Sequence, residues 1–211
     1  MTGKRQLQEG PKEEVKPAQA DGPVYFWKPS QPHGFLSQWY TSRFTVVGDR
    51  EDVEIKYMNC EHYMMHRKGM LFAPDGIITQ QILAPGKPAP HPSTLRSLGR
   101  QIPNFDGTVW GKERFQIVVD GNYLKFTQNE DLQTQLLATG NRELVEASPR
   151  DRIWGVGFGA NNAGAMRARW GSNLLGKALM EVRERIRNEQ HAQSQDPGAA
   201  VEALVAKRQK A

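Results

Sequence analysis

Residues 59–72 read Asn59-Cys60-Glu61-His62-Tyr63-Met64-Met65-His66-Arg67-Lys68-Gly69-Met70-Leu71-Phe72, and they predict a helix on which other elements pack. The segment contains no proline, and its only glycine is Gly69. Asn59 can cap the start of this helix, which places Glu61 near the positive end of the helix dipole. We therefore expect a helix with a carboxylate in its first turn.

One face of this predicted helix carries, at helical spacing, Glu61, Met65, Lys68 and Phe72. The face is mostly apolar, so Glu61 and Lys68 would lie two turns apart along a partly buried surface. Buried charges are costly unless they are paired or serve a function. Two interpretations remain open: solvated charges at the ends of an amphipathic helix, or a functional pair.

The length and composition indicate one soluble domain. The chain has 211 residues, enough for a hydrophobic core, and 24% of them are charged. No apolar run reaches membrane-spanning length, and the N-terminus lacks a hydrophobic signal region, so we expect no membrane association. The single cysteine, Cys60, excludes an internal disulfide and favours an intracellular location, in cytoplasm or nucleus.

The net charge of +5 lies in the central part of the chain, because residues 1–22 and 188–211 each contain equal numbers of acidic and basic side chains. A basic domain suits an anionic ligand such as a nucleotide or a nucleic acid. Ordinary solubility charge is the alternative interpretation.

The pattern along the chain predicts a mainly helical (α+β) domain over residues 23–188, between a disordered arm (1–22) and a flexible tail (189–211). The predicted elements are a hairpin with strands 43–47 and 53–57, and helices over 77–83, from Ser93 through Leu98, over 112–126, from Asn129 to Gly140, and over 174–187. Gly121 argues against the helix over 112–126.

Three possible sites for other chemistry are weak. His62 and His66 have the i, i+4 spacing of zinc ligands, but a third ligand is missing, so we expect no metal. We expect Cys60 to be a small buried residue rather than a nucleophile. Residues 155–159 contain three glycines but no helix is expected directly after them, so they do not form a dinucleotide-binding motif, and we expect no cofactor.

Glu146, Asp151 and Trp154 form a denser group of functional residue types, in a segment shaped by proline and glycine. An indole can stack on a base, and carboxylates can accept hydrogen bonds from sugar hydroxyls or from amines of a base. A core tryptophan flanked by surface acids explains the same residues equally well.

Several short segments carry a family resemblance in a fixed order along the chain. They are Gly34-Phe35-Leu36-Ser37, Cys60-Glu61-His62-Tyr63-Met64 with Lys68, Ser97-Leu98-Gly99-Arg100, Trp110, Lys125-Phe126-Thr127-Gln128-Asn129, Leu136-Leu137-Ala138-Thr139-Gly140, Leu144-Val145-Glu146-Ala147-Ser148-Pro149-Arg150-Asp151, Trp154-Gly155-Val156-Gly157, Gly171-Ser172-Asn173-Leu174-Leu175-Gly176 and Leu179-Met180-Glu181-Val182-Arg183. Together they resemble the NADAR family, the YbiA-like N-glycosidases. Two departures concern the substrate end: Gln38 and Trp39 follow Ser37 where the family often has asparagine, and residues 85–92 form a longer segment.

The resemblance implies a compact, mostly helical domain that cleaves N-glycosidic bonds of ribose derivatives. One branch resembles enzymes that hydrolyse phosphoribosylamino intermediates of riboflavin synthesis, and another resembles enzymes that remove ADP-ribose from guanine in nucleic acid. The resemblance implies catalytic roles for Glu61, Lys68 and Asp151. It implies substrate contacts for Ser37, Trp39, Arg100, Trp110, Lys125, Glu146, Trp154, Gly155 and Asn173.

The expected chemistry follows from the bond that is cleaved, which joins C1′ of a ribose to a nitrogen atom. Breaking a ribosyl C1′–N bond builds positive charge on the sugar, which Glu61 would stabilise, while Asp151 would hold the ribose or the base amine. Lys68 has three possible roles: proton donor, phosphate clamp, or amine nucleophile that forms an imine. The expected ligand is ADP-ribosylated nucleic acid or a similar nucleotide, without an obligate protein partner. A riboflavin-type intermediate and a non-catalytic nucleotide-binding module are the alternatives.

Overall fold

The computed structural model describes residues 22–47, 54–84 and 87–195. Its elements in chain order are β1 (Val24–Phe26), the 3-10 helix η1 (Gly34–Leu36), β2 (Phe44–Val47), β3 (Glu54–Tyr57), α1 (Cys60–Phe72), α2 (Ile77–Leu83), α3 (Pro92–Gly99), α4 (Gly107–Thr127), α5 (Glu130–Ala138), β4 (Leu144–Glu146), α6 (Ala160–Ala163), the 3-10 helix η2 (Arg167–Arg169) and α7 (Leu174–Gln195). The predicted mainly helical class with a small β component is confirmed. None of the described helices is both long and apolar enough to cross a bilayer.

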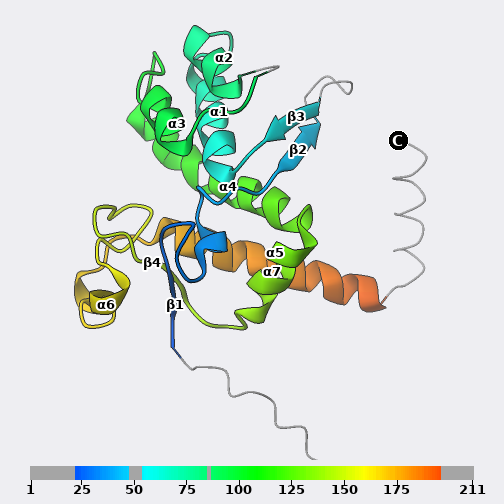
Figure 1. The fold of residues 1–211 in the computed structure, drawn as a ribbon, viewed down its shortest axis with the longest axis vertical. Helices are drawn as coiled ribbons and strands as arrows, with labels where there is room; N and C mark the ends of the chain where they lie inside the picture. Colours follow the sequence, from blue (N-terminus) through cyan, green and yellow to red (C-terminus); the bar gives the residue numbers. More distant parts are fainter. Residues whose placement is uncertain (1–21, 48–53, 85–86, 196–211) are drawn as a thin grey trace, which may run out of the picture.

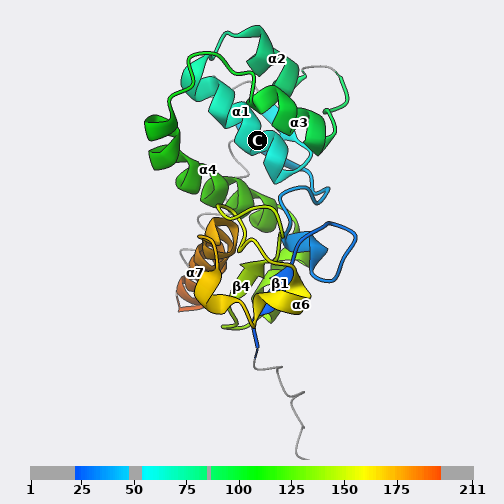
Figure 2. The same cartoon turned by 90° about the vertical axis from the view of Figure 1, so that its left-hand side faces the viewer.

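Helix α4 runs through the middle of the molecule and joins two groups of elements. Helices α1, α2 and α3 lie together at one end of the molecule, with the β2–β3 hairpin beside them (Figure 1). Helix α7, strands β1 and β4, and α6 lie at the other end (Figure 2). Helix α4 contacts α1 in the first group and α7 in the second, and it also contacts α5, which follows it in the chain.

The sequence of α4 explains why it forms despite its glycine. The Asp106 carboxylate caps its start by accepting hydrogen bonds from the backbone N–H groups of Thr108 and Val109, at 2.7 and 3.0 Å. A Cβ atom on Gly121 would lie 2.6 Å from the Tyr63 ring. The glycine that weakened the helix prediction therefore permits α1 and α4 to pack closely, at a helix-propensity cost of about 1 kcal/mol.

Two short strands were not predicted from the sequence. Strand β1 pairs in parallel with β4, with Phe26 opposite Glu146. The Asn173 side chain completes the free edge of β4: its Oδ1 accepts from the N–H of Glu146 at 3.0 Å, and its Nδ2 donates to the Leu144 carbonyl at 2.9 Å. The predicted hairpin is confirmed as the antiparallel pair β2–β3, and its turn lies outside the described residues.

Several predicted boundaries need correction. Helix α3 is capped by His91, whose ring accepts from the Ser93 N–H, so Ser93 lies inside the helix. Helix α7 continues to Gln195, beyond its predicted end at 187, while its stripe of Leu175, Leu179, Val182 and Ile186 is buried as expected. The single-turn helix α6 begins directly after Gly159, so the reason for excluding a dinucleotide motif was wrong. The predicted flexible tail over 189–211 begins as the last turns of α7, which end at Gln195, and the rest of it lies outside the described residues, as does the predicted arm over 1–22 except for Gly22.

Candidate active site

The first turn of α1 holds Glu61 in a buried position. Asn59 caps the helix, with its Oδ1 accepting from the His62 N–H at 2.9 Å, and the Glu61 N–H donates to the Gln38 carbonyl at 3.1 Å. Glu61 is only 8% exposed. Burial raises its pKa to about 7, although the Arg96 charge and a hydrogen bond from the Trp39 side chain act in the opposite direction. The carboxylate is therefore not a solvated surface charge.

Two further carboxylates, Glu146 and Asp151, lie near Glu61. Glu146 ends β4, and its Oε2 is buried without a hydrogen-bond partner among the described residues. Burial, together with the charges of Asp151 and Glu61, raises the pKa of Glu146 to about 8, although the Arg96 charge acts in the opposite direction. We call Glu61, Glu146 and Asp151 the carboxylate cluster. The charge of Asp151 raises the pKa of Glu61, and the charges of Asp151 and Glu61 raise that of Glu146, which is an arrangement typical of acid–base sites.

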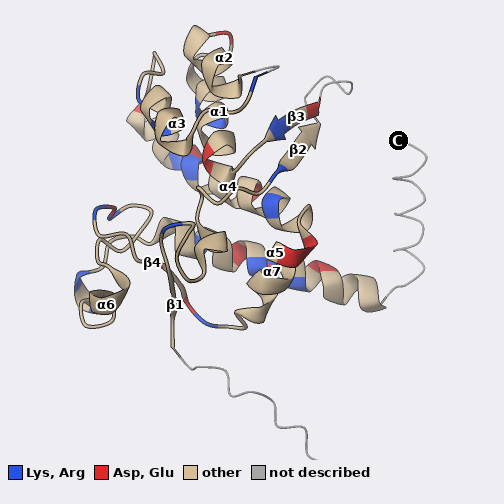
Figure 3. Ribbon diagram, in the orientation of Figure 1, with Lys and Arg blue, Asp and Glu red and all other residues tan. Residues whose placement is uncertain are grey.

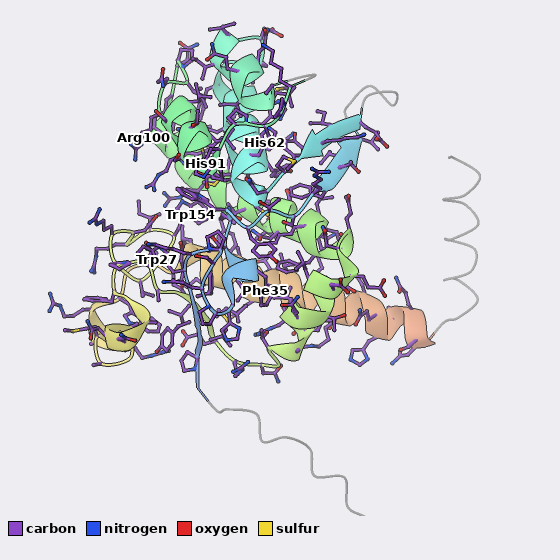
Figure 4. The ribbon with its side chains drawn as sticks, viewed as in Figure 1. Trp27, Phe35, His62, His91, Arg100 and Trp154 are labelled. Atoms are coloured by element: carbon purple, nitrogen blue, oxygen red, sulfur yellow. The ribbon has the colours of Figure 1, made fainter. Side chains whose placement is uncertain are left out.

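Asp151 also fixes the loop that carries Trp154. Its Oδ1 accepts from the backbone N–H groups of Ile153 and Trp154, at 2.9 and 2.8 Å. A Cβ atom on Gly155 would lie 2.7 Å from the Glu146 carbonyl oxygen, so only glycine allows the loop to return against β4. Gly155 thus positions the site through its backbone. The labelled side chains of Trp154, His91 and Arg100 lie on the same side of the molecule in Figure 4.

The sequence did not single out Arg96, the cation whose charge acts on both Glu61 and Glu146. Its helix α3 begins near Trp39, whose ring lies 6.1 Å from that of His91. The helix ends against α1, where Gly99 packs on Met65. Arg96 lies between these two contacts and is exposed. Only the packing of α3 on α1 reveals this role, because in the sequence Arg96 is an ordinary arginine on a short helix.

Lys68 lies at the other end of the same face of α1, in a group with Phe105, Trp110 and Arg100. Its Nζ donates to the Gly99 carbonyl at 2.6 Å and lies 4.2 Å from the centre of the Phe105 ring and 5.6 Å from that of Trp110. Burial lowers the pKa of Lys68, and the nearby Arg100 charge lowers it further. The sequence suggested Lys68, Trp110 and Arg100 but missed Phe105, which is 48% exposed.

Three predicted substrate contacts have structural roles instead. Lys125 is fully buried, and its Nζ donates to the backbone carbonyls of Phe35 and Ser37, so it cannot reach a phosphate. Burial lowers the pKa of Lys125 to about 8. The Ser37 hydroxyl accepts from the Trp39 N–H at 3.3 Å, and the Asn173 side chain is occupied by β4. Lys125 therefore supports the site from below rather than contacting the substrate, and Ser37 and Asn173 stabilise the backbone around it.

The structure gives no support to a metal site at His62 and His66 or to Cys60 as a nucleophile. His66 Nδ1 lies 2.7 Å from the Tyr57 hydroxyl, and the described part of the chain contains no group of three or more potential metal ligands. Burial raises the pKa of Cys60 to about 11, which makes this thiol a poor nucleophile. A hollow of about 640 Å³ lies along α7, lined in part by Glu181, Arg185 and Glu189, and contains none of the candidate site residues.

Comparison with known proteins agrees with the motifs. A family model described as the NADAR domain matches residues 25–187. N-glycosidase R617 of Acanthamoeba polyphaga mimivirus is 43% identical over 151 residues, which cover 71% of this chain and 85% of that protein. Riboflavin biosynthesis protein VVA0006 of Vibrio vulnificus is 31% identical over 81% of this chain but only 40% of its own length.

A solved structure supports the fold independently. The NMR structure of the E. coli protein YbiA superimposes with a TM-score of 0.60 at 26% sequence identity, covering 81% of this chain and 88% of that chain. The extent of the family match and the identity to the mimivirus protein confirm the predicted resemblance. The chain therefore belongs to the NADAR domain family and is an enzyme of the N-glycosidase class.

Proposed function

We propose that this N-glycosidase hydrolyses the bond between ribose C1′ and a guanine nitrogen in ADP-ribosylated nucleic acid. The observation that carries the proposal is the carboxylate cluster, in which Glu61 and Glu146 have pKa values of about 7 and 8. Near neutral pH such a pair can hold one proton, as acid–base catalysis of glycoside cleavage requires. A non-catalytic binding module would not need these buried carboxylates.

In the proposed reaction the C1′–N bond breaks and its electron pair leaves with the base. Protonated Glu146 donates its proton to the departing nitrogen, which makes the base a better leaving group. Ionised Glu61 stabilises the positive charge on the ribose and then accepts a proton from the water that attacks C1′. Asp151 uses Oδ1 for the loop, which leaves its other oxygen for a hydroxyl of the ribose or an amine of the base.

Charge and aromatic side chains favour a nucleic-acid substrate over a small metabolite. The chain has a net charge of +5, and Trp39, Trp110 and Trp154 are partly exposed around the two ends of the α1 face. Indoles at this exposure can stack on bases, and a basic protein attracts a polyanion. The Vibrio relative supports the alternative, a riboflavin-pathway substrate, but this chain covers only 40% of that protein.

Two parallel assays test the substrate. The purified protein is incubated with guanine-ADP-ribosylated single-stranded DNA and, separately, with a phosphoribosylaminopyrimidine, and the products are separated by chromatography. We expect a higher kcat/KM on the modified DNA. A higher kcat/KM on the pyrimidine would contradict the proposed substrate and would support the alternative, whereas binding of ADP-ribose without cleavage of either compound would indicate a binding module.

Lys68 is expected to act as an amine nucleophile, because only a neutral amine attacks and the pKa of Lys68 is lowered by burial. In this covalent form of the reaction the amine bonds to C1′ as the base leaves and gives up a proton, and the C1′–O4′ bond then breaks with protonation of O4′, which leaves an imine between Lys68 and C1′. The water that Glu61 deprotonates then attacks C1′ of this imine and releases the lysine. Borohydride added during turnover should reduce that imine to a stable secondary amine, detected by mass spectrometry on Lys68. Lys68→Met removes the amine that would form this adduct. Its matched control is Lys177→Met, which replaces an exposed lysine of α7. Absence of an adduct in the active wild type would instead indicate a proton donor or phosphate clamp.

A further inference from the structure

A cluster of arginines borders the candidate site and has no part in the proposed chemistry. Between Asp151 and Glu181 the sequence contains no acidic residue, whereas it contains the basic residues Arg152, Arg167, Arg169 and Lys177. Arg150 and Arg152 immediately flank Asp151 of the carboxylate cluster, and both are exposed. This segment is thus basic where it adjoins the carboxylate cluster.

Packing holds two of these arginines side by side. The guanidinium carbon of Arg152 lies 5.8 Å from the centre of the Phe158 ring, and that of Arg169 lies 5.9 Å from the same ring. One guanidinium nitrogen of Arg152 also donates to the Arg169 carbonyl at 2.8 Å. The two side chains are therefore preorganised on a shared aromatic residue rather than free on a flexible loop, which lowers the entropy lost on binding.

These arginines also lack acidic partners. Among the described residues no carboxylate lies within ion-pair distance of Arg150, Arg152 or Arg169, whereas the neighbouring Arg167 is paired with Glu143 at 2.6 Å. In Figure 3 the basic residues of this segment lie beside α6, and the β2–β3 hairpin lies on the opposite side of the molecule. Guanidinium groups without carboxylate partners are suited to phosphates.

We propose that Arg150, Arg152 and Arg169 form a surface that binds the phosphate backbone of a nucleic-acid strand next to the modified base. The proposal rests on the proposed function and adds to it a second contact, outside the carboxylate cluster. The occupant is a polynucleotide because the surface offers three exposed guanidinium groups without carboxylate partners among the described residues, which match repeated phosphates rather than the single diphosphate of an isolated ADP-ribosyl nucleoside.

The test compares two double variants with equal loss of charge. Arg150→Gln/Arg169→Gln removes two cations of the surface and breaks no hydrogen bond or ion pair made by these side chains among the described residues. Arg43→Gln/Lys56→Gln is the matched control on the β2–β3 side, where both residues are exposed. Binding of an unmodified, fluorescein-labelled single strand of about 20 nucleotides is measured by anisotropy across a salt series.

The surface double variant should bind about tenfold more weakly at low salt, and its log–log salt slope should fall by about 1 to 2, while the control double variant stays close to wild type. On modified DNA its kcat/KM should fall in parallel, with an unchanged kcat/KM on an ADP-ribosylated nucleoside. Equal losses in both double variants, or no loss in the surface variant, would overturn the proposal. Arg150→Gln alone gives the same readout if the double variant is unstable. Because strand binding is measured without turnover, failure of the proposed function would appear separately, as missing cleavage by the wild type.

Discussion

Replacing Glu61 by glutamine is expected to lower kcat about a thousandfold or more while the protein remains folded. Glutamine keeps the size and the hydrogen-bonding capacity of the side chain but can neither carry the negative charge that stabilises the ribosyl cation nor accept the proton from water. The helix start does not depend on the carboxylate, because Asn59 provides the cap. Activity is measured by release of ADP-ribose, and folding by the thermal midpoint Tm.

Glu130→Gln is the matched control for this substitution. Glu130 also lies in the first turn of a helix, α5, so its carboxylate is likewise near the positive end of a helix dipole. Unlike Glu61 it is exposed, and it lies neither in the carboxylate cluster nor beside Lys68. We expect its kcat to equal that of the wild type. A Glu61→Gln protein that keeps more than about a tenth of the wild-type kcat would rule out the proposed role of Glu61, since removing a positioned acid or base typically costs about 10²–10⁴-fold.

The second large effect is expected for Glu146→Gln, which should lower kcat about a hundredfold. Glu146 keeps its proton near neutral pH because burial and the neighbouring carboxylates raise its pKa to about 8. Glutamine cannot donate that proton to the leaving base. In the wild type kcat/KM should be greatest between about pH 7 and 8, where Glu61 is ionised and Glu146 protonated, and the decline on the alkaline side should disappear in the variant.

The same substitution should change how stability depends on pH. The folded-state pKa of Glu146 lies above its ordinary value of 4.5, so its stabilising contribution is complete below about pH 4.5 and is lost as pH rises to about 8. Each pKa unit corresponds to about 1.4 kcal/mol, so the loss is at most about 5 kcal/mol. Glu146→Gln should therefore gain Tm relative to wild type between pH 5 and pH 9. A Tm difference that does not vary with pH would show that Glu146 titrates normally.

The sequence predicted most helices because their apolar spacing and capping residues are local signals. The buried stripe of α7 and the strand pair β2–β3 were recognised in this way. The pairing of β1 with β4 was not, because each strand has only three residues and they lie more than a hundred positions apart. That pairing is what places Glu146 at the site.

The site was predicted less completely than the fold. The motifs suggested Glu61, Lys68 and Asp151 as catalytic residues, and the proximity of Glu61 to Glu146 and Asp151 depends on packing that no local pattern encodes. Lys125 was misjudged because a lysine is rarely fully buried, yet here two backbone carbonyls accept its hydrogen bonds. Arg96 was missed because its importance comes from how α3 lies against α1.

The bond that this enzyme breaks can be identified from the masses of its products. Wild-type protein is incubated with guanine-ADP-ribosylated single-stranded DNA, and both the released small molecule and the strand are weighed by mass spectrometry. Cleavage of the ribosyl C1′–N bond predicts intact ADP-ribose together with a strand of unmodified mass. Release of AMP, with a phosphoribosyl group left on the strand, or an unchanged substrate would show that the protein does not cleave the ribosyl C1′–N bond of this substrate.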